Sequence, residues 1–216
     1  MIPRIVLERA PTSAGEMVLA RRGEDFSIRV AGVELMNSGN HGSEDELGRI
    51  AGAVVAKIPE PRLLIGGLGM GFTLRAALDA LPATAHVDLA ELVPDVIRWN
   101  REVLGHLAGH PLEDPRVHVI EGDVAQVIAA ATGYHAILLD VDNGPDGVFA
   151  SNAVLYQRRG LAAAAAALAP GGTLAVWSSF DSATFTRWLT DLGFAVELRV
   201  LRIHGVKHYI WLAQKP

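Results

Sequence analysis

The sequence predicts an α/β protein with a mostly parallel, seven-stranded sheet that ends in an antiparallel hairpin and follows a small N-terminal β-domain. Two observations lead to this prediction. From residue 62 onward, short apolar runs alternate with helical segments, which is typical of a parallel sheet with helices on both faces. After the fifth such unit, residues 194–203 and 207–213 flank Gly205 in the pattern of a β-hairpin.

The first part of the chain has a different sequence pattern. Its short apolar runs are separated by glycines and contain no helical period. We expect strands there over residues 5–8, 16–21 and 26–30. Ser43 followed by Glu46 is a capping-box signature and predicts a helix over residues 44–57, which Pro59 ends. The expected division is a β-domain over residues 1–42, a linking helix over 43–61 and a nucleoside-binding domain over 62–216.

The second part contains five strand–helix units in succession. The expected strands are residues 63–66, 86–90, 117–120, 135–141 and 173–178. The expected helices are residues 72–81, 94–107, 124–131, 155–168 and 182–192. A hairpin after five such units resembles the class I methyltransferase fold and differs from a plain NAD-binding Rossmann domain.

Composition excludes several classes of function. The 216 residues are 50% hydrophobic and 20% charged, which allows a buried core and rules out a disordered chain. The net charge of −5 argues against a protein that binds nucleic acid or anionic membranes in general. Because there is no cysteine, disulfides, zinc–thiolate sites and thiol catalysis are excluded. Without a signal-peptide pattern or a long apolar run, we expect a soluble, cytoplasmic protein.

The first strand of the expected sheet leads into a glycine-rich turn. Its glycines are Gly66, Gly67, Gly69 and Gly71. Glycine permits positive φ and lets a ligand approach the backbone, at the edge of the sheet where α/β proteins bind ligands. The spacing is G-x-G-x-G, with Phe72 next, whereas a dinucleotide-binding loop has G-x-G-x-x-G. The loop therefore favours an adenosyl-sulfonium ligand over NAD, and a tight turn without any ligand is the structural alternative.

Acidic residues follow three further strands, at the same edge of the sheet. We expect Glu91 to accept hydrogen bonds from ribose hydroxyls and Asp123 to accept one from an adenine amine. Asp140 directly follows an apolar strand, so it is the candidate general base. The loop after it supplies further candidates for binding the substrate, namely Asp142, Asn143 and Asp146. His106 and His110 have the spacing of a helical metal pair but no third ligand, so we expect no metal.

These residues resemble the spermidine synthase-like polyamine aminopropyltransferases over about residues 25–180. The matching positions are Gly66, Gly67, Gly71, Glu91, Gly122, Asp123 and Asp140. The resemblance implies a transferase with a decarboxylated S-adenosylmethionine donor, whose aminopropyl group moves to an amine such as putrescine. It also implies a homodimer, with Asp140 as the base that takes the amine proton.

The departures from this family lie on the acceptor side. The loop aspartate that should hold the aminopropyl amine falls on Gly69, and the aspartate that should hold the diamine falls on Asn143. A glutamine that contacts the donor falls on Asn40, and His41 beside it is a further candidate for ligand contact. Two alternatives therefore stay open: a methyltransferase that uses intact S-adenosylmethionine on an unknown small molecule, and a catalytically silent nucleoside-binding relative.

Overall fold

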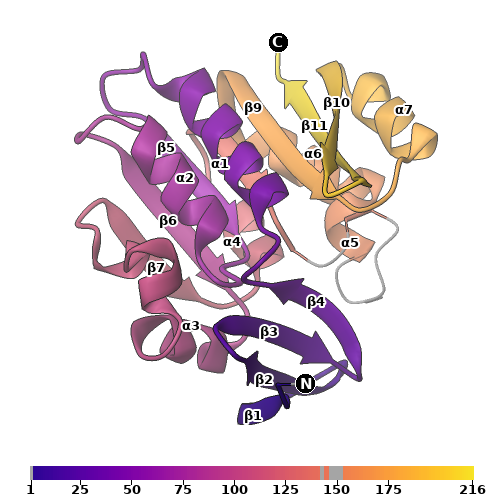
Figure 1. Cartoon of the computed structure of the whole chain (residues 1–216). Helices are drawn as coiled ribbons and strands as arrows, with labels where there is room; N and C mark the ends of the chain where they lie inside the picture. Colours follow the sequence, from indigo (N-terminus) through magenta and orange to yellow (C-terminus); the bar gives the residue numbers. More distant parts are fainter. Residues whose placement is uncertain (1, 142–143, 146–152) are drawn as a thin grey trace. The chain divides into compact units, whose positions relative to one another are not determined.

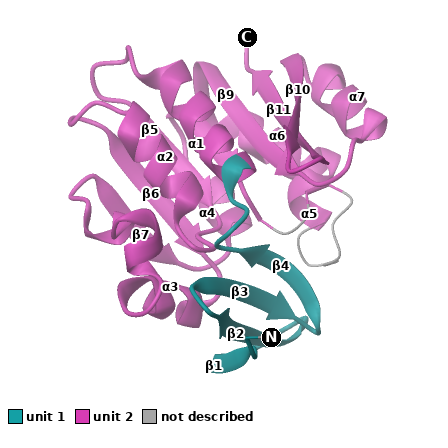
Figure 2. Ribbon diagram, viewed as in Figure 1, with its two compact units in different colours: residues 1–42 teal, residues 43–216 magenta. Residues whose placement is uncertain are grey.

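The computed structural model describes residues 2–141, 144–145 and 153–216, and the chain divides into two compact units (Figures 1 and 2). The first unit, Met1–Gly42, contains an antiparallel sheet in the order β1-β2-β3-β4. Its strands are β1 (Ile5–Thr12), β2 (Gly15–Arg22), β3 (Asp25–Val30) and β4 (Val33–Asn37). The two-residue turn between β3 and β4 has positive φ at Ala31 and Gly32, as tight hairpin turns require.

The second unit, Ser43–Pro216, contains a seven-stranded sheet in the order β10-β11-β9-β8-β5-β6-β7. Its strands are β5 (Arg62–Gly66), β6 (His86–Glu91), β7 (Val117–Glu121), β8 (Tyr134–Leu139), β9 (Leu168–Ser178), β10 (Ala195–Ile203) and β11 (Val206–Gln214). Strands β5 to β9 pair in parallel, while β11 pairs antiparallel with β9 and β10. The predicted fold class is confirmed, including the terminal hairpin.

Helices cover both faces of this sheet. They are α1 (Gly42–Val55), α2 (Phe72–Ala80), α3 (Pro94–Arg101), α4 (Val124–Ala130), α5 (Ala153–Tyr156), α6 (Arg158–Ala167) and α7 (Ala183–Asp191). Side chains of α4, α5, α6 and α7 pack with those of β8, β9 and β11 in one buried apolar cluster. On the other face, α1 packs so closely on α2 that a Cβ atom at Gly48 would lie 2.3 Å from the carbonyl oxygen of Thr73 (Figure 1).

The structure differs from the predicted elements in several places. The predicted helix over 94–107 stops at Arg101 and gives way to short 3₁₀ turns at Gly105–Ala108 and Pro111–Glu113. The predicted helix over 155–168 is two helices, since Gln157 is extended and β9 already begins at Leu168. Strand β4 was not predicted, because its residues are exposed or half-buried and show no alternation.

The predicted start of the first helix was also wrong in detail. Ser43 lies inside α1 rather than at its cap, and its hydroxyl donates to the carboxylate of Glu44 at 2.5 Å. Glu46, the expected capping partner, instead accepts hydrogen bonds from Arg49.

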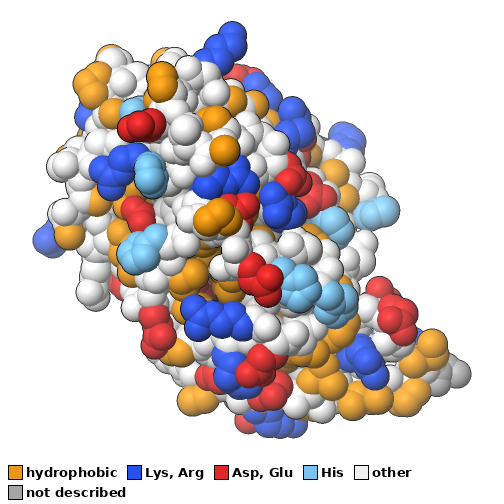
Figure 3. Space-filling view, turned by 90° about the vertical axis from the view of Figure 1, so that its left-hand side faces the viewer, with side chains coloured by type: hydrophobic (Ala, Val, Ile, Leu, Met, Phe, Trp, Pro, Cys, Tyr) orange, Lys and Arg blue, Asp and Glu red, His pale blue; other side chains and the backbone are white. Residues whose placement is uncertain are grey.

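Acidic and basic side chains are interspersed on the face shown in Figure 3. Within the described part of the chain, every helix is too short or too polar to cross a lipid bilayer.

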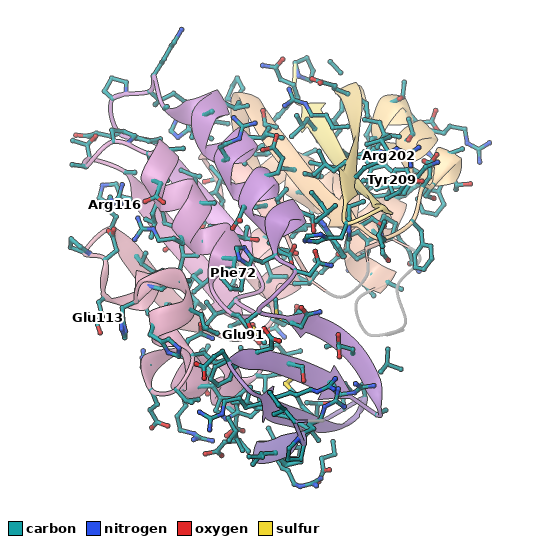
Figure 4. The ribbon with its side chains drawn as sticks, in the orientation of Figure 1. Phe72, Glu91, Glu113, Arg116, Arg202 and Tyr209 are labelled. Atoms are coloured by element: carbon teal, nitrogen blue, oxygen red, sulfur yellow. The ribbon has the colours of Figure 1, made fainter. Side chains whose placement is uncertain are left out.

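Arg116 ties together the amino-terminal side of β7 and the end of α2 (Figure 4). Its guanidinium donates to the carbonyl oxygens of Leu78, Leu81 and Pro82 at 2.9, 3.0 and 3.3 Å. It also pairs with both carboxylate oxygens of Asp114, and the two side chains are each only 15% exposed. The arginine therefore satisfies carbonyl groups that a helix end leaves without partners.

Arg116→Ala should lower the free energy of unfolding by about 2–3 kcal/mol, because it leaves a mostly buried carboxylate and several carbonyl groups without a donor. The bond from Arg116 lowers the pKa of Asp114 from 3.8 to about 2. This stabilisation is therefore complete above about pH 4 and is lost as the pH falls toward 2. Urea unfolding of the variant and of the original protein, above about pH 4 and near pH 2, measures this difference in the free energy of unfolding.

Arg98→Ala is the control, because it removes an ion pair at the surface and should cost less than about 1 kcal/mol. Equal losses for both variants would contradict the prediction.

Candidate functional site

The glycine-rich loop between β5 and α2 needs glycine for structural reasons. Gly67, Gly69 and Gly71 have φ values of 93°, 54° and 86°, a region that other residues rarely adopt. A Cβ atom on Gly67 would lie 2.2 Å from the carbonyl oxygen of Asp140, and one on Gly66 would lie 2.8 Å from Val124. The loop is thus a tight turn that also lets the end of β8 approach it closely.

Glu91, the last residue of β6, holds this loop in place (Figure 4). Its carboxylate accepts the backbone N–H of Leu68 at 2.9 Å and that of Val93 at 2.8 Å. The side chain is buried, and burial raises the pKa of Glu91, an effect that these backbone N–H groups oppose. Asn100 of α3 adds a second support, since its amide donates to the carbonyl oxygen of Gly69 at 2.8 Å.

Asp123 lies in the connection between β7 and α4, beside the end of β6. Its carboxylate caps α4 by accepting the N–H of Ala125 at 2.8 Å, and the preceding Gly122 donates to the backbone carbonyl of Glu91 at 2.9 Å. A Cβ atom at Gly122 would meet nothing within 4 Å, so open space adjoins this turn. The two acids therefore end neighbouring strands beside a glycine loop, and their carboxylates are acceptors that fit the hydroxyls and amine of a nucleoside.

Asp140 follows β8 and lies against the same loop. Its N–H donates to the carbonyl of Gly66 at 2.9 Å, and its carboxylate accepts the hydroxyl of Thr73 at 2.5 Å. Burial, and then the negative charge of Glu44, raise the pKa of Asp140 to about 7, while the bond from Thr73 opposes the rise. A carboxyl group with this pKa can accept and release a proton near neutral pH, as a general base must.

Sequence reasoning missed two residues that act on Asp140, namely Thr73 and Glu44, and it missed His208, on whose imidazole the charge of Glu44 also acts. Thr73 lies in the first turn of α2, and Glu44 in the first turn of α1. Trp177 of β9 and His208 of β11 have ring centroids 5.6 Å apart. Trp177 ends an expected strand at the ligand-binding edge, where the sequence predicts that it shapes the acceptor pocket, whereas His208, beside the hairpin turn, is predicted to be a surface residue. The only available signal for Glu44 and Thr73 was a polar residue in the first turn of a helix that begins at the ligand-binding edge.

The remaining predicted residues fall elsewhere. Asp142, Asn143 and Asp146 lie outside the described residues. Asn40 and His41 belong to the first unit, in the half-buried turn after β4. Within the described ranges, no three histidine or acidic side chains come together as metal ligands would.

Comparison with known proteins identifies relatives of one kind. No known family profile matches the chain. The polyamine aminopropyltransferases of Mycobacterium tuberculosis and Mycobacterium bovis are each 29% identical to it over 192 residues. The match covers 84% of this chain but 35% of each relative, so the chain spans about a third of the length of the curated relatives it matches.

Solved structures agree on the fold. A spermidine synthase in complex with the transition-state analogue AdoDATO superposes with a TM-score of 0.77 at 15% identity, covering 98% of this chain and 72% of that one. The spermidine synthase from Thermotoga maritima gives 0.78 at 15% identity, with 98% and 73% covered. Human methyltransferase-like protein 13 in complex with SAH gives 0.59 at 22% identity, with 80% and 79% covered. The fold is that of spermidine synthases and methyltransferase-like proteins, and the resemblance to polyamine aminopropyltransferases is confirmed.

Proposed function

We propose that this protein is a transferase of the spermidine-synthase type, which moves an aminopropyl group from decarboxylated S-adenosylmethionine to a small amine. The observation that carries the proposal is Asp140, a half-buried carboxyl group with a pKa raised to about 7, directly against the loop that Glu91 holds. The similarity to polyamine aminopropyltransferases supports it. A silent nucleoside-binding protein would have no use for such a carboxyl group at this position.

In this proposal the loop and two acids bind the nucleoside. Glu91 keeps acceptor capacity for ribose hydroxyls beyond the two N–H groups that it already binds. Asp123 accepts the adenine amine, and the glycine backbone at residues 66–71 lies along the ligand. Asn40 is a further candidate for donor contact. Asp142, Asn143, Asp146 and His41 are candidates on the acceptor side. We also propose that the protein acts in the cytoplasm as a homodimer, without a metal.

Asp140 performs the proton step. The donor supplies a sulfonium, which is a good leaving group. Small amines are mostly protonated at neutral pH, so the carboxylate of Asp140 takes a proton from the acceptor and leaves a nitrogen lone pair. That lone pair forms the new C–N bond while the C–S bond breaks, and the sulfur leaves as a neutral thioether. The protein contributes alignment and a base in a largely buried site.

A methyltransferase remains the second candidate, because Gly69 offers no acid for an aminopropyl ammonium and methyltransferase-like proteins share the fold. Calorimetry with both donors separates the two activities. We expect the decarboxylated donor to bind at least ten times more tightly than intact S-adenosylmethionine, and mass spectrometry to detect aminopropyl products from a panel of amines. Tighter binding of the intact donor would instead identify a methyltransferase, and binding of neither donor would contradict both activities.

A further inference from the structure

Two carboxylates from different helices and loops come together at the acceptor side of the site. The hydroxyl of Thr73 lies 2.5 Å from the carboxylate of Asp140 and 3.3 Å from the backbone carbonyl of Glu44, so the first turns of α1 and α2 meet the end of β8 here. Glu44 is buried at 9% exposure. Its negative charge contributes to the raised pKa of Asp140, which means that the two carboxyl groups interact.

Two ring side chains, Trp177 of β9 and His208 of β11, contact each other, and we call this pair the wall. The register pairs Ile210 of β11 with Trp177 of β9, which puts Trp177 and His208 on the same face of the sheet. Their rings lie against each other at a tilt of 33°. Both ring nitrogens of His208 and the indole nitrogen of Trp177 are buried and have no hydrogen-bond partner among the described residues. Unpaired buried polar atoms are costly, so three of them together need an explanation.

The charge of Glu44 also acts on the imidazole of His208 in this wall. The charge of Glu44 raises the pKa of His208, but burial lowers it more, so the imidazole is neutral at neutral pH. A neutral imidazole has one N–H donor and one nitrogen acceptor. The wall therefore offers hydrogen bonds in both directions without a charge.

We propose that Glu44, His208 and Trp177 form the acceptor subsite, and that it recognises a primary amine whose other end is uncharged and hydrogen-bonding, such as an amino alcohol. This inference rests on the proposed function. Glu44 supplies the second carboxylate that the sequence lacks at Asn143, and together with Asp140 it binds the reacting nitrogen. The hydroxyl at the far end of the acceptor pairs with His208 and Trp177.

A diamine fits this arrangement less well. Because Thr73 contacts both the carboxylate of Asp140 and the backbone of Glu44, the two acids lie beside one point of the site and suit one ammonium group rather than two separated by a hydrocarbon chain. A second ammonium at the wall would lose water and find one acceptor there, the unprotonated nitrogen of His208, because the indole N–H of Trp177 is a donor. A hydroxyl group there can donate to His208 and accept from Trp177 at once.

Binding measurements on the full chain test the subsite independently of transfer. Calorimetry should show that aminobutanol binds at least ten times more tightly than putrescine, which has the same chain length. Glu44→Gln should weaken both amines at least tenfold, because the ammonium loses a charged partner. His208→Phe should weaken only aminobutanol, and His208→Gln, which restores hydrogen-bonding groups, should recover part of that loss.

Glu46→Gln is the matched control, since Glu46 lies on the same helix but binds Arg49. It should leave both affinities unchanged. If Glu44→Gln fails to fold by circular dichroism, Ser43→Ala removes the hydroxyl that donates to Glu44 and should alter amine affinity in a folded protein. Tighter binding of putrescine, no amine binding, or equal effects of E44Q and E46Q would overturn the inference. Amine binding in this pattern without any transfer would count against the proposed function alone.

Discussion

Asp140→Asn should lower kcat/KM for aminopropyl transfer by a factor of about 10²–10⁴, the usual range for removing a general base. Asparagine has nearly the same shape and can still accept the hydroxyl of Thr73, but it cannot take a proton from the acceptor. Binding of the donor should stay unchanged, because Asp140 contacts the glycine loop through its backbone. Steady-state kinetics and donor calorimetry on the same preparation measure the two effects separately.

The pH dependence gives a second test of this role. In the proposed mechanism Asp140 acts as the carboxylate, and burial raises its pKa to about 7, so kcat/KM should fall as the pH drops through about 7. Thr73→Val removes a bond that lowers the pKa and should move this fall to higher pH. Glu44→Gln removes a negative charge that raises the pKa and should move it to lower pH. Shifts in the same direction for both variants would refute the assignment of Asp140 as the titrating group.

Loss of stability cannot account for the expected effect of Asp140→Asn. The pKa of Asp140 is raised in the folded chain, so ionising this carboxyl group weakens the fold as the pH rises from about 4 to 7. Asparagine carries no charge and avoids this penalty. Urea unfolding at pH 8 should therefore show the variant to be at least as stable as the original protein. Asp79→Asn, at an exposed pair with Arg75, is the control that should change neither activity nor stability.

The sequence was most informative where a local pattern decides the structure. Continuous apolar runs mark the parallel strands, and apolar residues with a helical period mark most of the helices between them. Because the two patterns differ in period, the sequence distinguishes the strands from the helices. The acids at the ends of strands could also be predicted, because Glu91, Asp123 and Asp140 each follow an apolar run directly.

Other features depend on contacts between distant segments. His208 contacts Trp177 because β11 pairs with β9, and the residues around His208 give no local signal for that pairing. Glu44 likewise acts on Asp140 across almost a hundred residues, through the packing of α1 and α2. The residues that we propose for the donor side could therefore be found in the sequence, whereas Glu44 and His208, which we propose for the acceptor side, could not.

Glu91→Gln should weaken binding of the decarboxylated donor by about a hundredfold or more. The carboxylate accepts N–H groups from Leu68 and Val93 and, in our proposal, ribose hydroxyls as well. Charge-assisted hydrogen bonds contribute roughly 1.5–3 kcal/mol each, and the amide nitrogen of glutamine would face donors where an acceptor is needed. Both the ribose contacts and the shape of the glycine loop therefore depend on this one side chain.

The matched control is Glu121→Gln, because Glu121 is paired in register with Glu91 on the neighbouring strand but is exposed. Calorimetry should find the original donor affinity in Glu121→Gln and a large loss in Glu91→Gln. Amine binding should persist in both variants, since Glu44 and His208 lie on other elements. Equal donor affinity in the two variants would mean that Glu91 only supports the loop. Loss of amine binding together with donor binding would mean that the loop, rather than α1 and β11, forms the acceptor side.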